Sequence, residues 1–184
     1  MRIEKQNTAA LFVDIQEKLL PAIHEGQHLL ARTVTLLEGL KILQIPMLFL
    51  RQYPKGLGDT VPELIHAAGG LHTPFDKLAY SAMKDDAIAA KIYAMKAQGI
   101  TNVLVCGVES HICVLQSCID LSSAGITPVM IVDCVGSRNP WEKDLAQKRA
   151  MQEGVLLSSV ESILFELCVT AGTDEFKAIA KLVK

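Results

Sequence analysis

Nearly continuous apolar segments alternate along the chain with longer segments of helical periodicity. The clearest apolar segments, rich in β-branched residues, are residues 8–15, 46–52, 102–108, 127–134 and 155–160. Such segments are typical of central parallel strands that are covered on both faces. A short strand around 76–81 would be the sixth. Helical patterns occupy residues 27–44, 84–98, 112–124 and 141–153, with two more near 160–171 and 173–183.

Glycines mark the ends of several helical patterns. Gly99, Gly125 and Gly154 each follow a helical pattern and precede a strand, where a C-terminal cap favours glycine. The alternation predicts a three-layer α/β/α domain with a parallel sheet. Because no linker divides the chain, a single domain over residues 1–184 is expected. Ligands of such sheets bind beyond the carboxyl ends of the strands, where the strand order reverses.

Composition and charge narrow the range of partners. The net charge is −2 and no basic cluster is present to displace counterions from phosphates, so no nucleic acid is expected. No apolar segment reaches the roughly 18–20 residues that cross a bilayer, and the N-terminal segment lacks the long apolar stretch of a signal peptide. The five cysteines lack C-x-x-C spacing, which indicates free thiols in a reducing compartment. We therefore expect a cytoplasmic protein with no membrane partner.

Asp14 ends the first predicted strand, within LFVDI. A carboxylate there is costly to bury unless it is hydrogen-bonded or paired with a cation. It is either a cap of the following helix or a functional acid. A haloacid-dehalogenase-type phosphatase would have a second Asp two residues later, where Gln16 stands, and a receiver domain would have an additional acid pair that is missing here.

Cys113 lies at the start of a helical pattern, after the strand that ends in CGVESHICVLQS (106–117). Free amide N–H groups and the helix dipole at such a position favour a thiolate and lower the thiol pKa. Cys106, Cys118 and Cys168 lie inside apolar or helical patterns and fit buried small hydrophobes. Cys113 is therefore the candidate nucleophile, with a buried structural thiol as the alternative.

A nucleophilic thiol needs a proton acceptor and an orienting charge. His111 is close in sequence, but it belongs to the loop that enters the helix and need not point toward Cys113; a loop or interface histidine is the alternative. Lys77, in PFDKLAYSAM (74–83), is either a surface residue or a partly buried cation that requires an acid. An acid–lysine pair beside the cysteine would form a coherent relay, with Asp14 taking the thiol proton. Spacing alone does not bring these residues together.

Several motifs resemble those of isochorismatase-like cysteine hydrolases and occur in the order found in that family. The resemblance covers roughly residues 8–168, and residues 51–64 with the C-terminal segment resemble the subgroup of isochorismatase domain-containing proteins. The motifs are VDIQEKL (13–19), K-x-x-Y-S-A (77–82), G-V-E-S-H-I-C-V (107–114) and D-C-V-G-S-R (133–138).

The resemblance implies a catalytic triad of Asp14, Lys77 and Cys113 on a Rossmann-like sheet of six parallel strands in the order 3-2-1-4-5-6. Strands 1 and 4 are neighbours in that order, which would bring Asp14 and Cys113 together. Similar enzymes usually assemble into dimers or larger rings, so we expect a homo-oligomer.

The resemblance also implies details of the loop before the nucleophile. A cis peptide is expected between Val108 and Glu109, and the backbone N–H groups of Ile112 and Cys113 are expected to form an oxyanion hole. Weaker candidates for the substrate pocket are Gln16, Phe75 and Tyr80, together with Ile112, and their alternative role is packing.

Metal binding is not expected. Nicotinamidases of this superfamily bind a metal through an Asp-x-His pattern after the second strand and a further histidine downstream. Here that region reads Arg51, Gln52 and Tyr53, and neither His66 nor His72 rebuilds the spacing. We expect neither a metal nor another cofactor, and nicotinamide becomes a weaker candidate substrate.

The predicted activity is hydrolysis of a small amide, imide or related acyl compound through a Cys113 thioester. Asp14 would act as base and then acid, and Lys77 would stabilise the charges in a dry pocket. One alternative is a non-catalytic binding or scaffold module. Another is a vinyl-ether hydrolase of the isochorismate type with Asp14 as general acid, for which Arg51 and Arg138 would bind carboxylates unless they simply face solvent.

Overall fold

The computed structural model describes residues 2–184, and a six-stranded sheet forms its centre. The strand order is β3-β2-β1-β4-β5-β6, and each pair of neighbouring strands is parallel. The predicted fold class and strand order are therefore confirmed. The strands are β1 (Thr8–Val13), β2 (Met47–Gln52), β3 (Phe75–Lys77), β4 (Asn102–Val108), β5 (Thr127–Gly136) and β6 (Leu156–Ser158).

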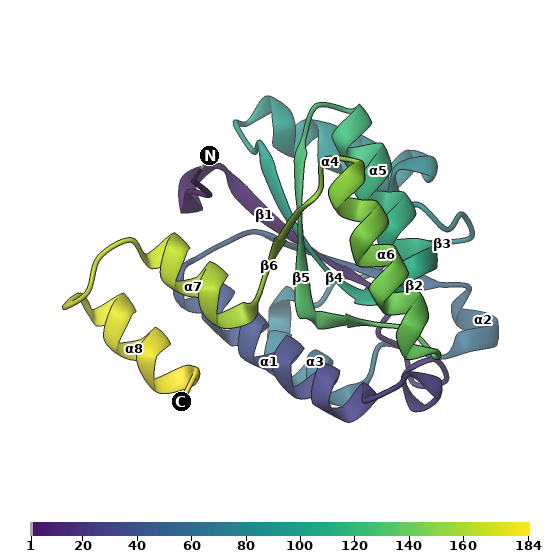
Figure 1. Ribbon diagram of the computed structural model, residues 1–184, viewed down its shortest axis with the longest axis horizontal. Coiled ribbons are helices and arrows are strands. Elements are labelled where there is room, and N and C mark those ends of the chain that lie inside the picture. The colour runs from purple at the N-terminus through teal and green to yellow at the C-terminus, as the bar shows by residue number, and fades with distance from the viewer. Residues whose placement is uncertain (1) are drawn as a thin grey trace.

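Helices cover both faces of the sheet and complete the three layers (Figure 1). Figure 1 shows α1, α3, α7 and α8 on one side and α4, α5 and α6 on the other. The α-helices are α1 (Gly26–Ile42), α2 (Pro54–Leu57), α3 (Pro62–Ala68), α4 (Asp86–Ala97), α5 (Leu115–Ser123), α6 (Pro140–Gln152), α7 (Val160–Cys168) and α8 (Asp174–Leu182). The 3₁₀ turns are η1 (Lys5–Asn7), η2 (Leu20–Ala22), η3 (Gly69–Leu71) and η4 (Ala82–Lys84), and η5 (Ser110–Val114) is a π-helical turn.

The core consists of two apolar layers, one on each face of the sheet. Successive residues of a strand point to opposite faces, so Phe12 packs in the layer under α1 whereas Val13 packs in the layer under α4 and α5. In the first layer, Phe12 stacks on Phe49 of β2 with ring centroids 4.8 Å apart. This double coverage explains why the strands are apolar throughout rather than alternating.

The structure differs from the predicted elements in the segment after β2 and before α5. The short helices α2 and α3 were not predicted; each begins with a proline, which suits the first turn of a helix. The predicted helix 112–124 begins instead as η5 and continues as α5. The third strand is β3, shorter than the predicted 76–81 and beginning one residue earlier.

The glycine caps agree with the prediction. Gly99, Gly125 and Gly154 have φ values of 100°, 69° and 81°, in the left-handed region that favours glycine after a helix. Across residues 2–184, no helix combines the length and the apolar character needed to cross a membrane.

Candidate active site

Three elements bring the candidate residues to the carboxyl edge of the sheet. Asp14 directly follows β1, Lys77 ends β3, and Cys113 lies in η5 directly after β4. The order reverses at β1, because the chain builds β2 and β3 on one side of it and β4 to β6 on the other. The candidate residues therefore lie where open parallel sheets bind ligands.

The backbone around Asp14 is held in an unusual conformation. Its φ of 54° is in the left-handed region, which is uncommon for residues other than glycine and recurs at functional sites. Its N–H donates to the carbonyl of Leu50 at 3.2 Å. Gly107 of β4 lies opposite Val13, and a Cβ atom on Gly107 would lie 1.9 Å from the Val13 carbonyl oxygen. Only glycine therefore allows β4 to approach β1 this closely beside Asp14.

Asp14 and Lys77 form a fully buried ion pair. Lys77 Nζ lies 2.7 Å from Asp14 Oδ2, and neither side chain is exposed. Nζ also donates to Gln52 Oε1 at 2.7 Å and approaches the carbonyl oxygens of Ala79 and Tyr80 at 3.3 and 3.2 Å. A lysine ammonium has only three N–H donors, so protein acceptors satisfy all of them. Lys77 is therefore a fixed counter-charge with no donor left for a substrate.

The second carboxylate oxygen of Asp14 faces a different environment. Asp14 Oδ1 is buried and has no hydrogen-bond partner among residues 2–184. Cys113 nevertheless lies close enough for its thiol to affect the pKa of Asp14. Burial raises the pKa of Asp14, against the lowering effect of the Lys77 charge. Asp14 thus has one oxygen bound by lysine and one left for a neighbouring donor.

The thiol of Cys113 is protonated at rest, which corrects the expectation of a lowered pKa. Burial, followed by the negative charge of Asp14, raises the pKa of Cys113 to about 12, although Lys77 acts in the opposite direction. Only 6% of Cys113 is exposed. The effect of a helix start is local, and burial outweighs it here. Reaction at neutral pH would therefore require Cys113 to lose its proton to a nearby base.

The loop before Cys113 turns sharply. The peptide bond between Val108 and Glu109 is cis. The Glu109 carbonyl accepts hydrogen bonds from the N–H groups of Ile112 and Val114, at 3.1 and 3.2 Å. The N–H of Ile112 is thus already engaged in this structure, and it would have to leave Glu109 to serve an oxyanion.

Side chains of the same loop bind the segment that follows β5. Glu109 accepts hydrogen bonds from the backbone N–H of Arg138 at 2.9 Å and from Arg138 Nε at 3.1 Å. His111 Nδ1 lies 2.9 Å from Ser137 Oγ. His111 and Arg138 therefore hold the loop before Cys113 against its neighbour, and Nδ1 of His111 is already engaged by Ser137.

The predicted pocket residues occupy different positions. Gln16 is fully buried, and its side-chain amide donates to the carbonyl oxygens of Gln52 and Gly58, so it holds backbone. Phe75 is half-buried against the apolar layer under α4. The Tyr80 side chain is exposed. Of these residues, Gln16 contacts the triad region through its side-chain amide, and Tyr80 does so through its backbone carbonyl, which accepts from Lys77.

Two further polar residues lie beside the predicted site. Arg51 is paired with Asp59 and Asp76, at 2.8 and 2.7 Å, so its charge is neutralised beside the site. Gln52, which binds Lys77 directly, was not predicted as a site residue. Its position at the end of a central strand was the available signal. Within residues 2–184, no cluster of three or more His, Cys, Asp or Glu side chains is arranged to hold a metal ion.

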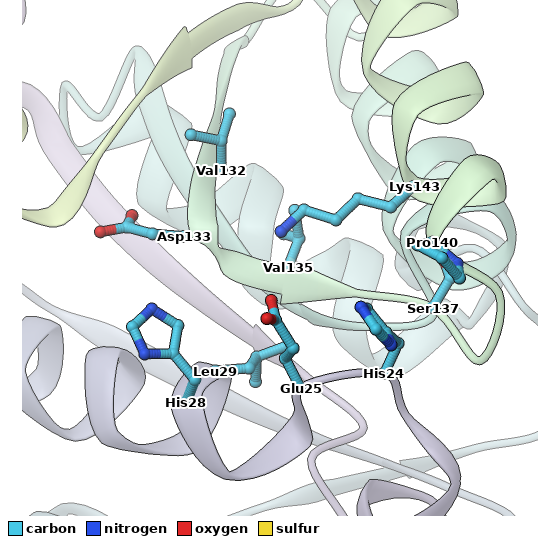
Figure 2. Close-up of a pocket in the computed structure, with 10 residues that line it drawn as sticks. All are labelled: His24, Glu25, His28, Leu29, Val132, Asp133, Val135, Ser137, Pro140 and Lys143. Carbon is cyan, nitrogen blue, oxygen red and sulfur yellow. The ribbon is translucent and has the colours of Figure 1, made fainter.

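A separate cavity of about 210 Å³ lies between α1, the end of β5 and the start of α6 (Figure 2). Its lining includes the exposed side chains of His24, Glu25 and His28 and the half-buried Lys143, and none of the triad residues. Ser137 at its edge is the residue that contacts His111. The cavity therefore adjoins the loop contacts but not the triad.

Comparisons with known proteins identify the family. The family model of the isochorismatase domain matches residues 8–162. Isochorismatase domain-containing protein 2 of Danio rerio is 34% identical over 183 residues, covering 99% of this chain and 89% of that protein. The structure of the MAR1 ribonuclease from Caenorhabditis elegans has a TM-score of 0.90 and 33% identity, covering 100% of this chain and 92% of that one. The YcaC gene product of Escherichia coli, an octameric hydrolase of unknown specificity, shares the fold with a TM-score of 0.90 at 22% identity, covering 99% and 89%. The chain belongs to the isochorismatase family.

Proposed function

We propose that this protein is a cysteine hydrolase that cleaves a small amide, imide or related acyl C–N substrate through a thioester on Cys113. Asp14 is the base and then the acid, and Lys77 is its electrostatic partner. The observation that carries the proposal is that the two carboxylate oxygens of Asp14 have different surroundings. Lys77 binds Oδ2 at 2.7 Å, whereas Oδ1 lacks a partner within the described chain and Cys113 is close enough to affect the pKa of Asp14.

The raised pKa values fit a proton transfer that accompanies attack. A thiol with a pKa of about 12 is unreactive as such at neutral pH. Burial raises the pKa of Asp14 and makes its carboxylate a stronger base than an exposed one. Lys77 compensates the charge, so the carboxylate can accept the proton within a site that excludes water.

The reaction then proceeds in two halves. As the sulfur of Cys113 bonds to the substrate carbonyl carbon, the thiol proton passes to Asp14 Oδ1 and the carbonyl electron pair moves onto oxygen. Collapse re-forms the carbonyl, breaks the C–N bond and releases the amine, which takes the proton from Asp14. Water next adds to the thioester and gives its proton to Asp14. Collapse then breaks the C–S bond, and Asp14 returns the proton to the thiolate as the acid leaves.

The oxyanion of each tetrahedral intermediate requires hydrogen-bond donors. We propose the backbone N–H of Cys113, together with that of Ile112 once it leaves the Glu109 carbonyl. Because that bond is 3.1 Å long in the structure, the proposal includes a small movement of the η5 turn when substrate binds. No cofactor takes part in this scheme.

One observation favours a second candidate, a vinyl-ether hydrolase. Burial raises the pKa of Asp14, and a carboxyl group that stays protonated can donate to a vinyl ether as general acid. Cys113 would then be dispensable. A non-catalytic binding module with a retained triad is the remaining alternative, and it predicts no turnover of any substrate.

The proposal favours a small molecule over RNA, although one structural relative is named a ribonuclease. The net charge is −2, and Arg51 beside the site is already paired with Asp59 and Asp76. We further propose that residues 1–184 act as one domain, in the cytoplasm and as a homo-oligomer, for which the octameric YcaC relative is a precedent of the same fold.

A substrate screen with matched variants tests the function. Amides, imides, vinyl ethers and a short RNA are incubated with the wild type, Cys113→Ala, Asp14→Asn and the control Cys168→Ala, and products are followed by mass spectrometry. The proposal expects amine release only from wild type and Cys168→Ala, and an acyl group on the Cys113 peptide after acid quenching. Activity that survives in Cys113→Ala but not in Asp14→Asn would instead support the vinyl-ether reaction. Cleavage of RNA alone, or turnover of none of the substrates, would contradict the proposal.

A further inference from the structure

Gln52 links the buried ion pair to the end of β2. It is the last residue of β2, and β2 lies between β1 and β3 in the sheet. Its side chain contacts Lys77 at 2.7 Å, as close as the contact between Lys77 and Asp14. Gln52 is therefore the second side-chain acceptor on the ammonium group that neutralises the proposed base.

The orientation of the Gln52 amide is set by its two partners. Nε2 donates to the Leu78 carbonyl at 2.8 Å, and Oε1 accepts from Lys77 Nζ at 2.7 Å. A carbonyl oxygen accepts only and an ammonium donates only. If the amide were rotated by half a turn, its NH₂ group would face the Lys77 ammonium, and both groups are donors. Its oxygen would face the Leu78 carbonyl, and both groups are acceptors. Oε1 must therefore face the lysine.

The backbone of Gln52 is fixed as well. Its N–H donates to Gln16 Oε1 at 2.7 Å, and its carbonyl accepts from Gln16 Nε2 at 3.0 Å. Gln16 is fully buried and also donates to the Gly58 carbonyl at 2.8 Å. Because these hydrogen bonds satisfy the buried Gln16 side chain, they hold it in a single conformation. Gln16 thus fixes Gln52, and Gln52 fixes Lys77.

We infer that Gln52 is a positioning residue for the hydrolysis proposed above. It holds Lys77 against Oδ2 of Asp14, which leaves Oδ1 for the thiol of Cys113. A neutral amide suits this role because it accepts a hydrogen bond without competing for the lysine charge. A carboxylate at this position would share that charge and raise the pKa of Asp14 further.

The inference rests on the proposed function, so its test uses the thiol itself and needs no substrate. Iodoacetamide labelling of each cysteine is followed by peptide mass spectrometry from about pH 5 to about pH 9. The proteins are the wild type, Gln52→Met, Gln52→Glu, Asp14→Asn and the surface control Gln98→Met. Cys118, which is fully buried in a helix, reports in the same samples whether a variant has unfolded.

Two different effects are expected at position 52. Gln52→Met removes the acceptor and slows Cys113 labelling about tenfold near neutral pH, with Cys118 still protected. Gln52→Glu keeps an acceptor but adds a negative charge that raises the pKa of Asp14, so the midpoint of the labelling profile that reports ionisation of Asp14 moves upward by about one unit. Gln98→Met matches the wild type, and Asp14→Asn slows labelling at least as much as Gln52→Met.

The outcomes separate the inference from the function it rests on. If Asp14→Asn slows Cys113 labelling but both Gln52 variants match the wild type, Gln52 has no positioning role and the proposed base stands. If Gln52→Glu slows labelling without moving the midpoint, the residue is only structural and the inference is wrong. If Asp14→Asn has no effect, the proposed base fails and the inference fails with it.

Discussion

The candidate triad and the cavity of Figure 2 lie near the same edge of the sheet, but they differ in the burial of their charged side chains. At the triad, the side chains of Asp14 and Lys77 are fully buried and paired at 2.7 Å. In the cavity, the side chains of His24, Glu25 and His28 are exposed. Water solvates exposed charges, whereas a buried charge persists only with a partner.

This difference in burial indicates which of the two regions is better suited to catalysis. Of these two regions, the candidate triad is the one that places the proposed nucleophile, base and counter-charge in a buried site, and burial strengthens each electrostatic interaction. The cavity is lined by the exposed side chains of His24, Glu25 and His28 (Figure 2). The cavity of Figure 2 is therefore not the stronger candidate for catalysis.

The largest expected effect separates the two regions by activity. Cys113→Ala should reduce amide hydrolysis by at least about a thousandfold, because no other group at the triad can form the thioester. Lys143→Met, at the cavity, should retain the wild-type rate within about twofold. Initial rates on the best substrate of the screen measure both. A loss in Lys143→Met comparable to that in Cys113→Ala would place the reaction at the cavity.

The next effect concerns stability. Asp14→Asn removes the partner of a fully buried ammonium group and should lower the free energy of unfolding by about 3–5 kcal/mol. Asp133→Asn is the matched control at the cavity, where Asp133 and its partner Arg32 are both partly exposed. That change should cost only about 0–1 kcal/mol. Urea unfolding at neutral pH measures both, and equal losses would show that burial does not distinguish the pairs.

Some of this arrangement could be predicted from the sequence. Continuous apolar segments identified β1, β2, β4, β5 and β6, since strands covered on both faces need no polar alternation. The three glycine caps followed from local geometry, and the motif resemblance indicated the strand order. The short helices α2 and α3 were missed because each makes too few turns to show a period of its own.

The site was harder to predict because its chemistry depends on distant contacts. Lys77 is 63 positions from Asp14, so spacing could not pair them, and only the family resemblance did. The direction of the Cys113 pKa shift was wrong because the helix start is a local signal, whereas burial and the Asp14 charge come from the tertiary fold. Gln52 was overlooked for the same reason, since its role depends on contacts to β3 and the segment after it.

A third effect distinguishes two buried thiols that titrate at similar pH. The pKa of both Cys113 and Cys118 is raised to about 12, but burial alone acts on Cys118 whereas Asp14 also acts on Cys113. Asp14→Asn removes that negative charge and should lower the pKa of Cys113 only. In the wild type, ionised thiol is favoured in the unfolded chain between about pH 9 and about pH 12, so stability falls as pH rises through that window.

Labelling rates across this range should therefore cross. Near neutral pH, Asp14→Asn slows Cys113 labelling because the base is lost. Above about pH 9, it should speed labelling several-fold, because each unit by which the pKa falls makes the thiolate about ten times more abundant. Peptide mass spectrometry follows Cys113 and Cys118 together. Equal acceleration of both thiols would indicate unfolding, and no crossing would show that Asp14 does not act on Cys113.

The smallest effect is expected at the cavity itself. His28→Ala removes an exposed side chain and Lys143→Met removes the charge of a half-buried one. Each change should alter the free energy of unfolding by less than about 0.5 kcal/mol. Raising the salt concentration should change these effects on the free energy of unfolding equally little, since interactions between exposed charges are largely screened. Urea unfolding at low and high ionic strength measures both effects. A loss above about 1 kcal/mol would mean that these charges are coupled as tightly as those of the triad. The distinction between an open, solvated cavity and a closed, paired site would then fail.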